Sequence, residues 1–362
     1  MSQQKSSNPQ RPTIGATQIR LLERLCNACA ISGDEGEVRK IVLEQVRSHA
    51  DEVKVDALGN VLVMRSGKAE NRLRVMLAAH MDEIGFMLTQ AEEDSTYRFD
   101  TVGGIDIRQL AGKPVWIGHE HVPGVIGAKP IHLTDSDDRD HTFTLESLRI
   151  DTGLGKNSKI QLGNRATFAT AFSRLGGSLR AKALDDRLGV ATLIELVKNA
   201  PANIDLLAAF TVQEEVGLRG AQVAAYALNP DLAFVLDSTP ANDLPAWDGS
   251  ENTRYNTRLG AGAAIYLADS STLSDPRLVR FLIDTAEKHE LAYQIRQPGG
   301  GGTDAGSIHK QRAGIPSVSI SVPARYPHTA ASIARLADWR STLALVYQAL
   351  CNLTPEIFAA DR

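Results

Sequence analysis

Two hydrophobic periodicities alternate along most of the chain. Short apolar runs such as LRVMLAAH and LAFVL are typical of strands buried on both faces, whereas RLGVATLIELVKNA and DPRLVRFLIDTAEKHE carry apolar residues at helical spacing. Near the C-terminus, SVSISV predicts a late strand and residues 333–350 predict a closing helix. Because strands and amphipathic helices alternate, the pattern predicts an α/β fold with a mixed, mainly parallel sheet covered by helices on both faces.

The N-terminal part of the chain predicts helices followed by strands. Residues 1–13 have no apolar pattern and are expected to form a flexible tail, whereas residues 17–30 have the pattern of an amphipathic helix. Residues 32–35 (SGDE) are expected to open a second helix. Residues 53–65 (VKVDALGNVLVMR) place two apolar runs on either side of a Gly-Asn pair, which predicts a hairpin.

The pattern of hydrophobic and polar residues changes between residues 86 and 173. Short β-type runs, among them GFMLT, PVWIG, GVIGA and ATFATAF, are broken there by glycines, prolines and polar residues. This composition predicts an inserted small β-barrel-like domain over residues 86–173. Residues 14–85 and 174–362 are then expected to form the main domain.

Charge and composition exclude several classes of function. The chain has 39 Lys and Arg against 43 Asp and Glu, a net charge of −4, so no basic surface for nucleic acid or an anionic membrane is expected. The first thirteen residues lack a signal-peptide core, and no apolar run is long enough to span a bilayer. Only three cysteines occur in the chain. These features predict a soluble cytoplasmic protein that binds neither nucleic acid nor membrane.

Cys26 and Cys29 have the spacing of a redox or zinc pair. They lie within an amphipathic helical pattern, however, and no second pair of cysteines or histidines follows nearby. Both are therefore expected to be packing residues. Surface or packing roles are also expected for six histidines, namely His119, His121, His132, His141, His289 and His309.

Side chains able to bind metal ions follow several of the predicted strands, namely His80 with Asp82, Glu214 with Glu215, Asp237, and His328. A further pair, Asp185 with Asp186, lies in a loop before a predicted helix. Each taken alone has a simpler explanation, such as a helix cap or a solvated surface. Because ligands in an open α/β sheet bind beyond the carboxyl ends of the strands, these residues are expected to converge. Two histidines and several carboxylates are the ligand set of a pair of borderline divalent cations.

A hydrolytic site with two metal ions also needs a bridging carboxylate and a base. Glu214 and Glu215 are adjacent, so one can bind a metal while the other faces the attacking water. Asp82 follows His80 by two residues and is placed to accept a hydrogen bond from the second ring nitrogen of that histidine.

Six ordered motifs give the chain a specific resemblance. LAAHMDEIGFM, KALDDRLG, TVQEEVGLRGA, VLDS, GGGTDAG and RYPHT occur in this order, preceded by ISGDE and VDALGNV. From about residue 18 to residue 352 the chain resembles the co-catalytic metallo-aminopeptidases of the glutamyl aminopeptidase or tetrahedral (TET) family.

The resemblance implies a role for each matching residue. His80 and Asp237 would be terminal ligands of one metal ion, Glu215 and His328 would be terminal ligands of the other, and Asp185 would bridge the two. Glu214 would be the general base and later the general acid, with Asp82 as the partner of His80.

The resemblance also implies cofactors and partners. Two divalent ions per subunit are expected, and the histidine and carboxylate ligands suit zinc or cobalt. The inserted domain would serve as a dimerisation or lid element in a homo-oligomer built from dimers, which in this family is often a tetrahedral dodecamer.

The glycine run over residues 299–302 suggests a phosphate-binding loop, but no Gly-Lys-Ser/Thr follows it. These glycines are expected instead to let the backbone approach the substrate. Gly302, Thr303 and Asp304 are accordingly predicted to line the substrate pocket.

The hypothesis favoured by the sequence is an aminopeptidase that removes the N-terminal residue of short peptides by means of a metal-bridging water activated by Glu214. Three alternatives stay open: a two-metal deacylase or carboxypeptidase, a glycoside hydrolase that uses Glu214 and Glu215, and an inactive assembly protein. The glycoside hydrolase is disfavoured because aromatic residues, which form sugar-binding platforms, make up only 5% of the chain.

Overall fold

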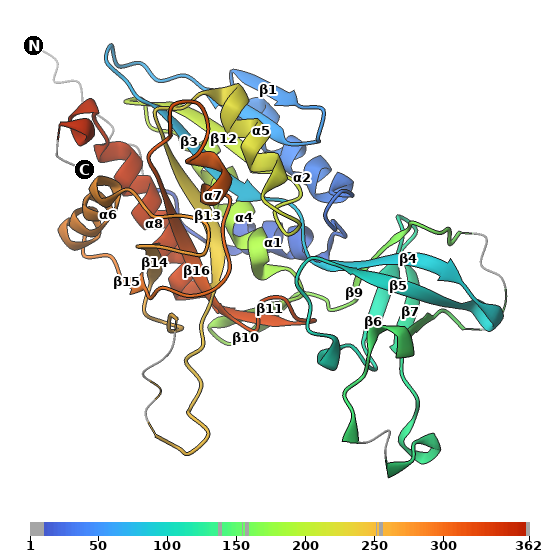
Figure 1. The fold of residues 1–362 in the computed structure, drawn as a ribbon. Coiled ribbons are helices and arrows are strands. Elements are labelled where there is room, and N and C mark those ends of the chain that lie inside the picture. The colour runs from blue at the N-terminus through green and yellow to red at the C-terminus, as the bar shows by residue number, and fades with distance from the viewer. Residues whose placement is uncertain are drawn as a thin grey trace, which may run out of the picture.

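The chain folds into an α/β part and a closed β-barrel (Figure 1). A computed structural model describes residues 11–136, 140–153, 155, 159–250, 252 and 256–359. Residues 1–10 of the predicted tail lie outside the described residues.

The α/β part is built on an 11-stranded mixed sheet. Its central strands β12, β3, β13 and β16 run parallel to one another, and antiparallel strands extend the sheet on both sides. The strands of this sheet are β1 (Glu52–Val55), β2 (Val61–Arg65), β3 (Arg74–His80), β10 (Ser173–Leu175), β11 (Ser178–Ala181), β12 (Asp205–Thr211), β13 (Leu232–Pro240), β14 (Ala263–Tyr266), β15 (Tyr293–Arg296), β16 (Ser317–Arg325) and β17 (Ser332–Arg335).

Helices cover both faces of this sheet because its central strands are apolar on both faces. Along β3, Val75 and Leu77 contribute to one core cluster, whereas Met76 and Ala78 contribute to another. Helices α1, α2, α4, α6 and α8 pack on the first side, and α5 and α7 pack on the second. The helices are α1 (Ala16–Asn27), α2 (Gly36–Val46), α4 (Leu184–Lys198), α5 (Arg219–Leu228), α6 (Pro276–Lys288), α7 (Ala305–Ile308) and α8 (Leu336–Asn352).

The inserted segment forms a closed barrel in the strand order β4-β5-β8-β7-β6-β9. In its core, the ring of Phe86 packs edge-on against Phe99 and Phe168, with ring centroids 5.2 Å apart in both pairs. The mixed, mainly parallel sheet and the inserted barrel predicted from the sequence are confirmed. The barrel strands are β4 (Gly85–Ala91), β5 (Thr96–Val102), β6 (Pro114–Ile117), β7 (Val122–Gly127), β8 (Arg149–Asp151) and β9 (Arg165–Phe168).

The buried carboxylate of Glu83 lies where the sheet leads into the barrel. It pairs with Lys182 Nζ at 2.6 Å and with Arg187 Nη2 at 2.9 Å. It also accepts hydrogen bonds from the backbone N–H of Ala30 and from the hydroxyl of Thr167 in β9. One ionised group therefore links the connection after α1, the start of α4 and the barrel.

The prediction of a helix over residues 333–350 is wrong in its first turn. Residues Ser332–Arg335 form β17, which pairs with β11 and with the end of β16, and α8 begins only at Leu336. The backbone of this segment hydrogen-bonds to two neighbouring strands, and those pairings override the helical spacing of its apolar residues.

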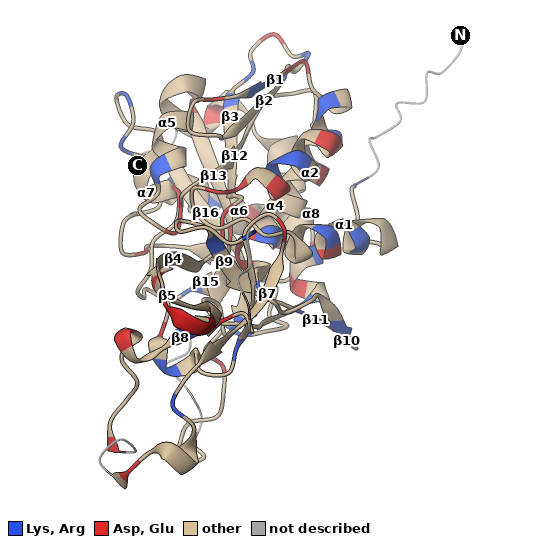
Figure 2. Ribbon diagram, turned by 90° about the vertical axis from the view of Figure 1, so that its right-hand side faces the viewer, with Lys and Arg blue, Asp and Glu red and all other residues tan. Residues whose placement is uncertain are grey.

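Charges of both signs lie side by side on the helices. Figure 2 shows Lys and Arg next to Asp and Glu on α1 and α2. Within the described ranges, no helix combines the length and the apolar character needed to cross a membrane.

Candidate active site

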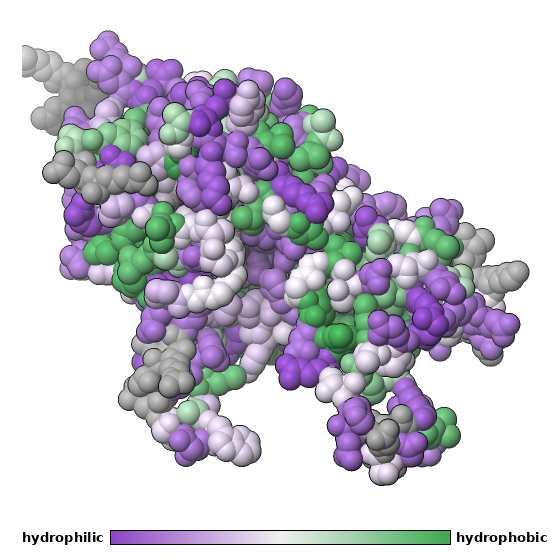
Figure 3. Space-filling view, viewed as in Figure 1, coloured by the Kyte–Doolittle hydropathy of each residue, from purple (hydrophilic) through white to green (hydrophobic). Residues whose placement is uncertain are grey.

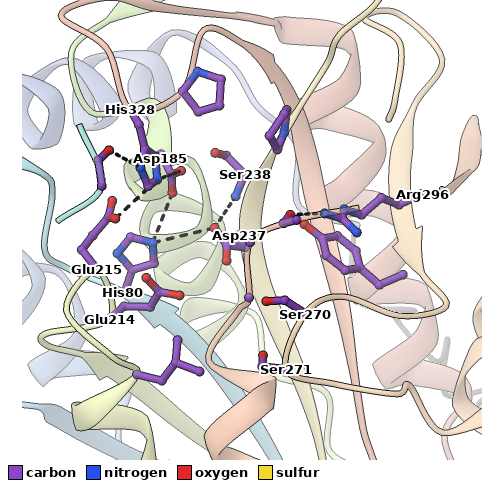
Figure 4. A pocket seen from close by; sticks show the side chains of 18 residues that line it. His80, Asp185, Glu214, Glu215, Asp237, Ser238, Ser270, Ser271, Arg296 and His328 are labelled. Carbon is purple, nitrogen blue, oxygen red and sulfur yellow. Dashed lines mark hydrogen bonds and ion pairs between the residues drawn. The ribbon is translucent and has the colours of Figure 1, made fainter. Parts of the chain in front are cut away.

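The side chains singled out in the sequence meet at the carboxyl edge of the parallel strands. His80 is the last residue of β3, Glu214 and Glu215 follow β12, and Asp237 lies in β13. His328 follows β16, and Asp185 stands at the start of α4 (Figure 4). Parallel strands bring their carboxyl ends to one edge, which explains why segments far apart in sequence converge.

Asp185 lies between the two histidines. Its Oδ1 is 3.2 Å from Nε2 of His80, and its Oδ2 is 3.7 Å from Nε2 of His328. Each histidine also has a second carboxylate beside it. Asp237 Oδ1 lies 3.7 Å from His80 Nε2, and Glu215 Oε2 lies 3.3 Å from His328 Nε2. The arrangement consists of two groups of ligand atoms that share one carboxylate.

Asp82 holds both His80 and the glutamate pair. Nδ1 of His80 lies 3.2 Å from the backbone oxygen of Asp82 and 3.5 Å from its Oδ1. The same buried carboxylate accepts hydrogen bonds from the Ser32 hydroxyl at 2.6 Å and from the backbone N–H groups of Glu214 and Glu215 at 3.0 and 3.2 Å. Asp82 therefore turns Nε2 of His80 toward Asp185 and positions the loop after β12.

His328 is held by residues of the inserted segment. Its Nδ1 lies 2.9 Å from the carbonyl oxygen of Gly104, and its own carbonyl accepts a hydrogen bond from Gln109 Nε2 at 3.2 Å. Both partners lie between β5 and β6. Sequence reasoning missed them, because a backbone carbonyl has no side-chain signature.

Asp186 supports the start of α4. The peptide bond between Asp185 and Asp186 is cis, and neither residue has helical backbone angles. Oδ1 of Asp186 accepts the backbone N–H of Gly189 at 2.9 Å, as a helix cap does. A Cβ at position 189 would lie 2.4 Å from both Asp186 carboxylate oxygens, so the close approach requires glycine there.

Burial makes several of these carboxyl groups hard to ionise. Burial raises the pKa of Glu215 to about 8 and that of Asp237 to about 7. It also raises the pKa of Glu214 well above its usual value, and the nearby carboxylates add to that shift. Burial alone would raise the pKa of Asp185, but hydrogen bonds to His80 and Asp237 together with the charges of His80 and His328 lower it below the usual value. The site thus concentrates more acidic groups than its two histidines can neutralise.

This excess of acidic groups fits divalent cations. Ligand atoms of His80, Asp185 and Glu215 lie within 4.8 Å of one another, as do those of His80, Asp186 and Asp237. Oδ2 of Asp186 is buried with no hydrogen-bond partner, so this second group contains an acceptor that a cation could satisfy. Imidazole nitrogens and carboxylate oxygens are ligands that zinc and cobalt accept.

A cavity adjoins this cluster and opens between the α/β part and the barrel, where Figure 3 shows a hollow in the surface. Of the three residues predicted to line a substrate pocket, Gly302 lines this cavity, whereas Thr303 and Asp304 do not. The Thr303 hydroxyl hydrogen-bonds to Ser319 at 2.7 Å, and Asp304 Oδ2 accepts a hydrogen bond from Thr211 at 2.5 Å. Both side chains are buried behind the cavity wall.

Arg296 lines the other end of the cavity, as Figure 4 shows. Its guanidinium lies 4.3 Å from the centre of the Tyr266 ring. It also donates to Thr239 Oγ1 and to the carbonyl of Gly300, each at 3.1 Å. These contacts fix the cationic guanidinium of Arg296 in the cavity wall. The sequence did not point to this residue, because no recognisable motif surrounds it.

The sequence profile of M42 glutamyl aminopeptidase matches residues 59–345. The chain belongs to this family. It is 31% identical to the glutamyl aminopeptidase of Lactococcus lactis, covering 90% of this chain and 94% of the relative. It is 30% identical to the lysyl aminopeptidase of Pyrococcus furiosus, covering 93% and 98%. These matches identify this M42 chain as an aminopeptidase, a peptide hydrolase.

Solved structures of TET peptidases share the fold of this M42 chain. The TET aminopeptidase of a marine sediment Thaumarchaeota archaeon superposes with a TM-score of 0.89 at 32% identity, covering 95% of this chain and 98% of that one. The TET1 peptidase of Pyrococcus horikoshii, described as able to assemble into a tetrahedron or a large octahedral shell, gives a TM-score of 0.81 at 32% identity, covering 93% and 100%.

Proposed function

We propose that this M42 aminopeptidase uses two divalent metal ions to remove the N-terminal residue of short peptides. The position of Asp185, with one oxygen toward each histidine, carries the proposal. It supports Asp185 as a shared ligand, His80 with Asp237 as ligands of one ion, and Glu215 with His328 as ligands of the other. Zinc or cobalt is the expected metal.

Glu214 is the proposed general base. When bound, the two ions would lower the pKa of a water molecule and polarise the carbonyl group of the substrate. Glu214 lines the cavity next to His80 and is free to face a water there. It takes the proton as the water oxygen bonds to the peptide carbon, and it gives that proton to the leaving nitrogen as the C–N bond breaks.

Restriction to N-termini is proposed to follow from the free α-amino group of the substrate. That group can bind a metal ion as a neutral amine or pair with a carboxylate that lines the cavity. An acylated terminus can do neither.

Self-association is part of the proposal. The assemblies described for the Pyrococcus horikoshii peptidase support a homo-oligomer. We propose that it is built from dimers, and a tetrahedral dodecamer is the form to test for by light scattering. The inserted barrel is the proposed contact element. A cytoplasmic location remains a prediction, supported by the free thiols of Cys26, Cys29 and Cys351.

The test is hydrolysis of a panel of aminoacyl chromogenic amides by the purified protein before and after chelation, with zinc or cobalt then added back. We expect release only from substrates with a free amine, loss of release on chelation, and recovery with metal. Activity that resists chelation would contradict the metal mechanism. Cleavage of N-acylated substrates alone, with metal bound, would favour a deacylase or a carboxypeptidase.

A further inference from the structure

Three potential metal ligands that do not line the active-site cavity come together between the α/β part and the barrel. They are Cys29, which follows α1, Glu37 in the first turn of α2, and His121, in the turn between β6 and β7. One ligand atom from each lies within 4.8 Å of the other two. The predicted packing role is confirmed for Cys26, which is fully buried in the core, but Cys29 lines a small cavity instead.

The side chain of His121 is aimed at Glu37. Nε2 of His121 lies 2.6 Å from Oε1 of Glu37, and Oε2 of the same carboxylate accepts the backbone N–H of Cys29 at 2.9 Å. The ring of His121 stacks on Trp116, with centroids 5.8 Å apart. His121 has a φ of 49°, a conformation that non-glycine residues adopt only where the surroundings hold them.

We propose that a zinc ion binds between Cys29 Sγ, the Glu37 carboxylate and His121 Nε2, as a site separate from the active site. Thiolate, imidazole and carboxylate are the three ligand types that zinc takes in proteins. Ligand atoms around a tetrahedral zinc lie roughly 3.3–3.8 Å apart, so the contact between Glu37 and His121 must open by about 1 Å. Water takes the fourth position.

The residues that line the cavity include two carboxylates, those of Asp34 and Glu37, and one guanidinium, that of Arg165. His119 also lines it, with Nε2 3.7 Å from Oδ1 of Asp34. The cations Lys182 and Arg187 also act on Cys29, but both are paired with the buried carboxylate of Glu83. With neutral histidines, the cavity lining therefore has one more carboxylate than guanidinium, which suits a cation.

Metal binding requires the Cys29 thiol to ionise. Burial raises the pKa of this thiol to about 12, so without metal it is protonated at neutral pH. Formation of the sulfur–zinc bond releases that proton to solvent, and no oxidant or reductant is needed.

A zinc ion here would link the α/β part to the barrel. Cys29 and Glu37 belong to the α/β part, whereas His121 belongs to the barrel that carries Gly104 and Gln109. Because those two residues hold His328, fixing the barrel would also steady one side of the active site. The site itself does not rest on the proposed function, since none of its ligands lies in the active-site cavity.

Cobalt titration of the metal-stripped full-length protein tests the site. A cysteine thiolate bound to cobalt gives a near-ultraviolet charge-transfer band, which a site of histidines and carboxylates lacks. We expect this band in the wild type, its loss in Cys29→Ser and His121→Ala, and its retention in Cys351→Ser, where another partly buried free cysteine is changed. The zinc content of Cys29→Ser is expected to fall by one ion per chain. A wild type without the band, or a Cys29→Ser variant that keeps it, would overturn the proposal.

Thiol alkylation provides a second test that needs no substitution. Zinc added to the wild-type protein is expected to slow alkylation of Cys29 at least tenfold, as measured by peptide mass spectrometry, while Cys351 in the same digest serves as the internal control. Equal alkylation of Cys29 with and without zinc would contradict the site. Glu37→Gln should restore the zinc-free rate of Cys29 alkylation in the presence of zinc, because it removes a ligand and leaves the thiol in place.

Discussion

The carbonyl oxygen of Gly104 lies 2.9 Å from Nδ1 of His328, although 224 residues separate them along the chain. This contact turns the opposite ring nitrogen of His328 toward Glu215 and Asp185. Gly104 belongs to the segment between two barrel strands. The inserted part of the chain therefore helps to shape the candidate metal site in the same protomer. If the Gly104 carbonyl moved away, the imidazole of His328 would be free to rotate.

Gln109→Ala is expected to weaken metal binding at His328. The substitution removes the hydrogen bond from Gln109 to the carbonyl of His328. His328 then keeps only one of these two hydrogen bonds to the inserted segment, the one to Gly104. Loss of such outer contacts lowers metal affinity by about tenfold or more. Metal titration of the chelated protein measures the effect. Gln311→Ala is the matched control, because it removes a bond from a glutamine to the Ser307 carbonyl elsewhere, and equal affinities in the two variants would contradict the prediction.

Glu214→Gln is expected to lower kcat by about 10² or more while the metal content stays unchanged, because the amide cannot take a proton from water. Steady-state kinetics with an aminoacyl amide and elemental analysis check both statements. Glu44→Gln, which changes an exposed glutamate on α2, is the control and should leave both values as they are. A Glu214→Gln variant that stays active would remove Glu214 from its proposed role.

His80→Ala and His328→Ala are each expected to lose metal. Each substitution removes one nitrogen ligand from one of the two groups that share Asp185. Elemental analysis after gel filtration is the measurement. His289→Ala, which alters a histidine that contacts Asn352, serves as the control, and full occupancy in either ligand variant counts against the ligand set.

Asp82→Asn is expected to lower metal affinity or kcat by about 10- to 100-fold with the fold intact. The amide cannot accept hydrogen bonds from both backbone N–H groups of Glu214 and Glu215 with the strength of a carboxylate. A structural role alone would change the melting temperature without changing metal affinity. Metal titration and thermal unfolding of the same sample therefore separate the two explanations.

Glu83→Gln is expected to destabilise the protein by about 3–5 kcal/mol, because it leaves Lys182 and Arg187 buried without a counter-charge. Urea unfolding measures the change in the free energy of unfolding. Glu120→Gln, which breaks an exposed pair with Lys159, should change it by less than about 1 kcal/mol.

The pH dependence of unfolding tests the same group. Burial alone would raise the pKa of Glu83, but Lys182 and Arg187 lower it below the usual value of 4.5. A carboxyl whose pKa is lowered on folding stabilises the protein above its unfolded pKa, and this contribution is lost as the pH falls through the folded pKa. The stability difference between wild type and Glu83→Gln is therefore expected to shrink below about pH 4.5. A difference that is constant down to pH 3 would contradict the ion-pair explanation.

Sequence periodicity predicted the main elements because their signals are local. The alternating cores on the two faces of β3 and the amphipathic pattern of α6 can be read from neighbouring residues. The same reasoning failed at Ser332–Arg335, where pairing with β11 and β16 decided the conformation. Short strands with few apolar residues depend on their partners, and a partner distant in sequence leaves no local trace.

For the candidate site, too, the sequence and the tertiary structure determined different features. The sequence by itself determined which residue types stand at the strand ends, and its ordered motifs determined the family to which the chain belongs. Only the tertiary structure decided that Asp185 directs one oxygen to each histidine and that a backbone carbonyl of the inserted segment orients His328. It alone brought Cys29, Glu37 and His121 together. Such contacts depend on how distant segments pack, and neither the spacing of residues nor their chemical type encodes a distance between parts of the chain that meet only after folding.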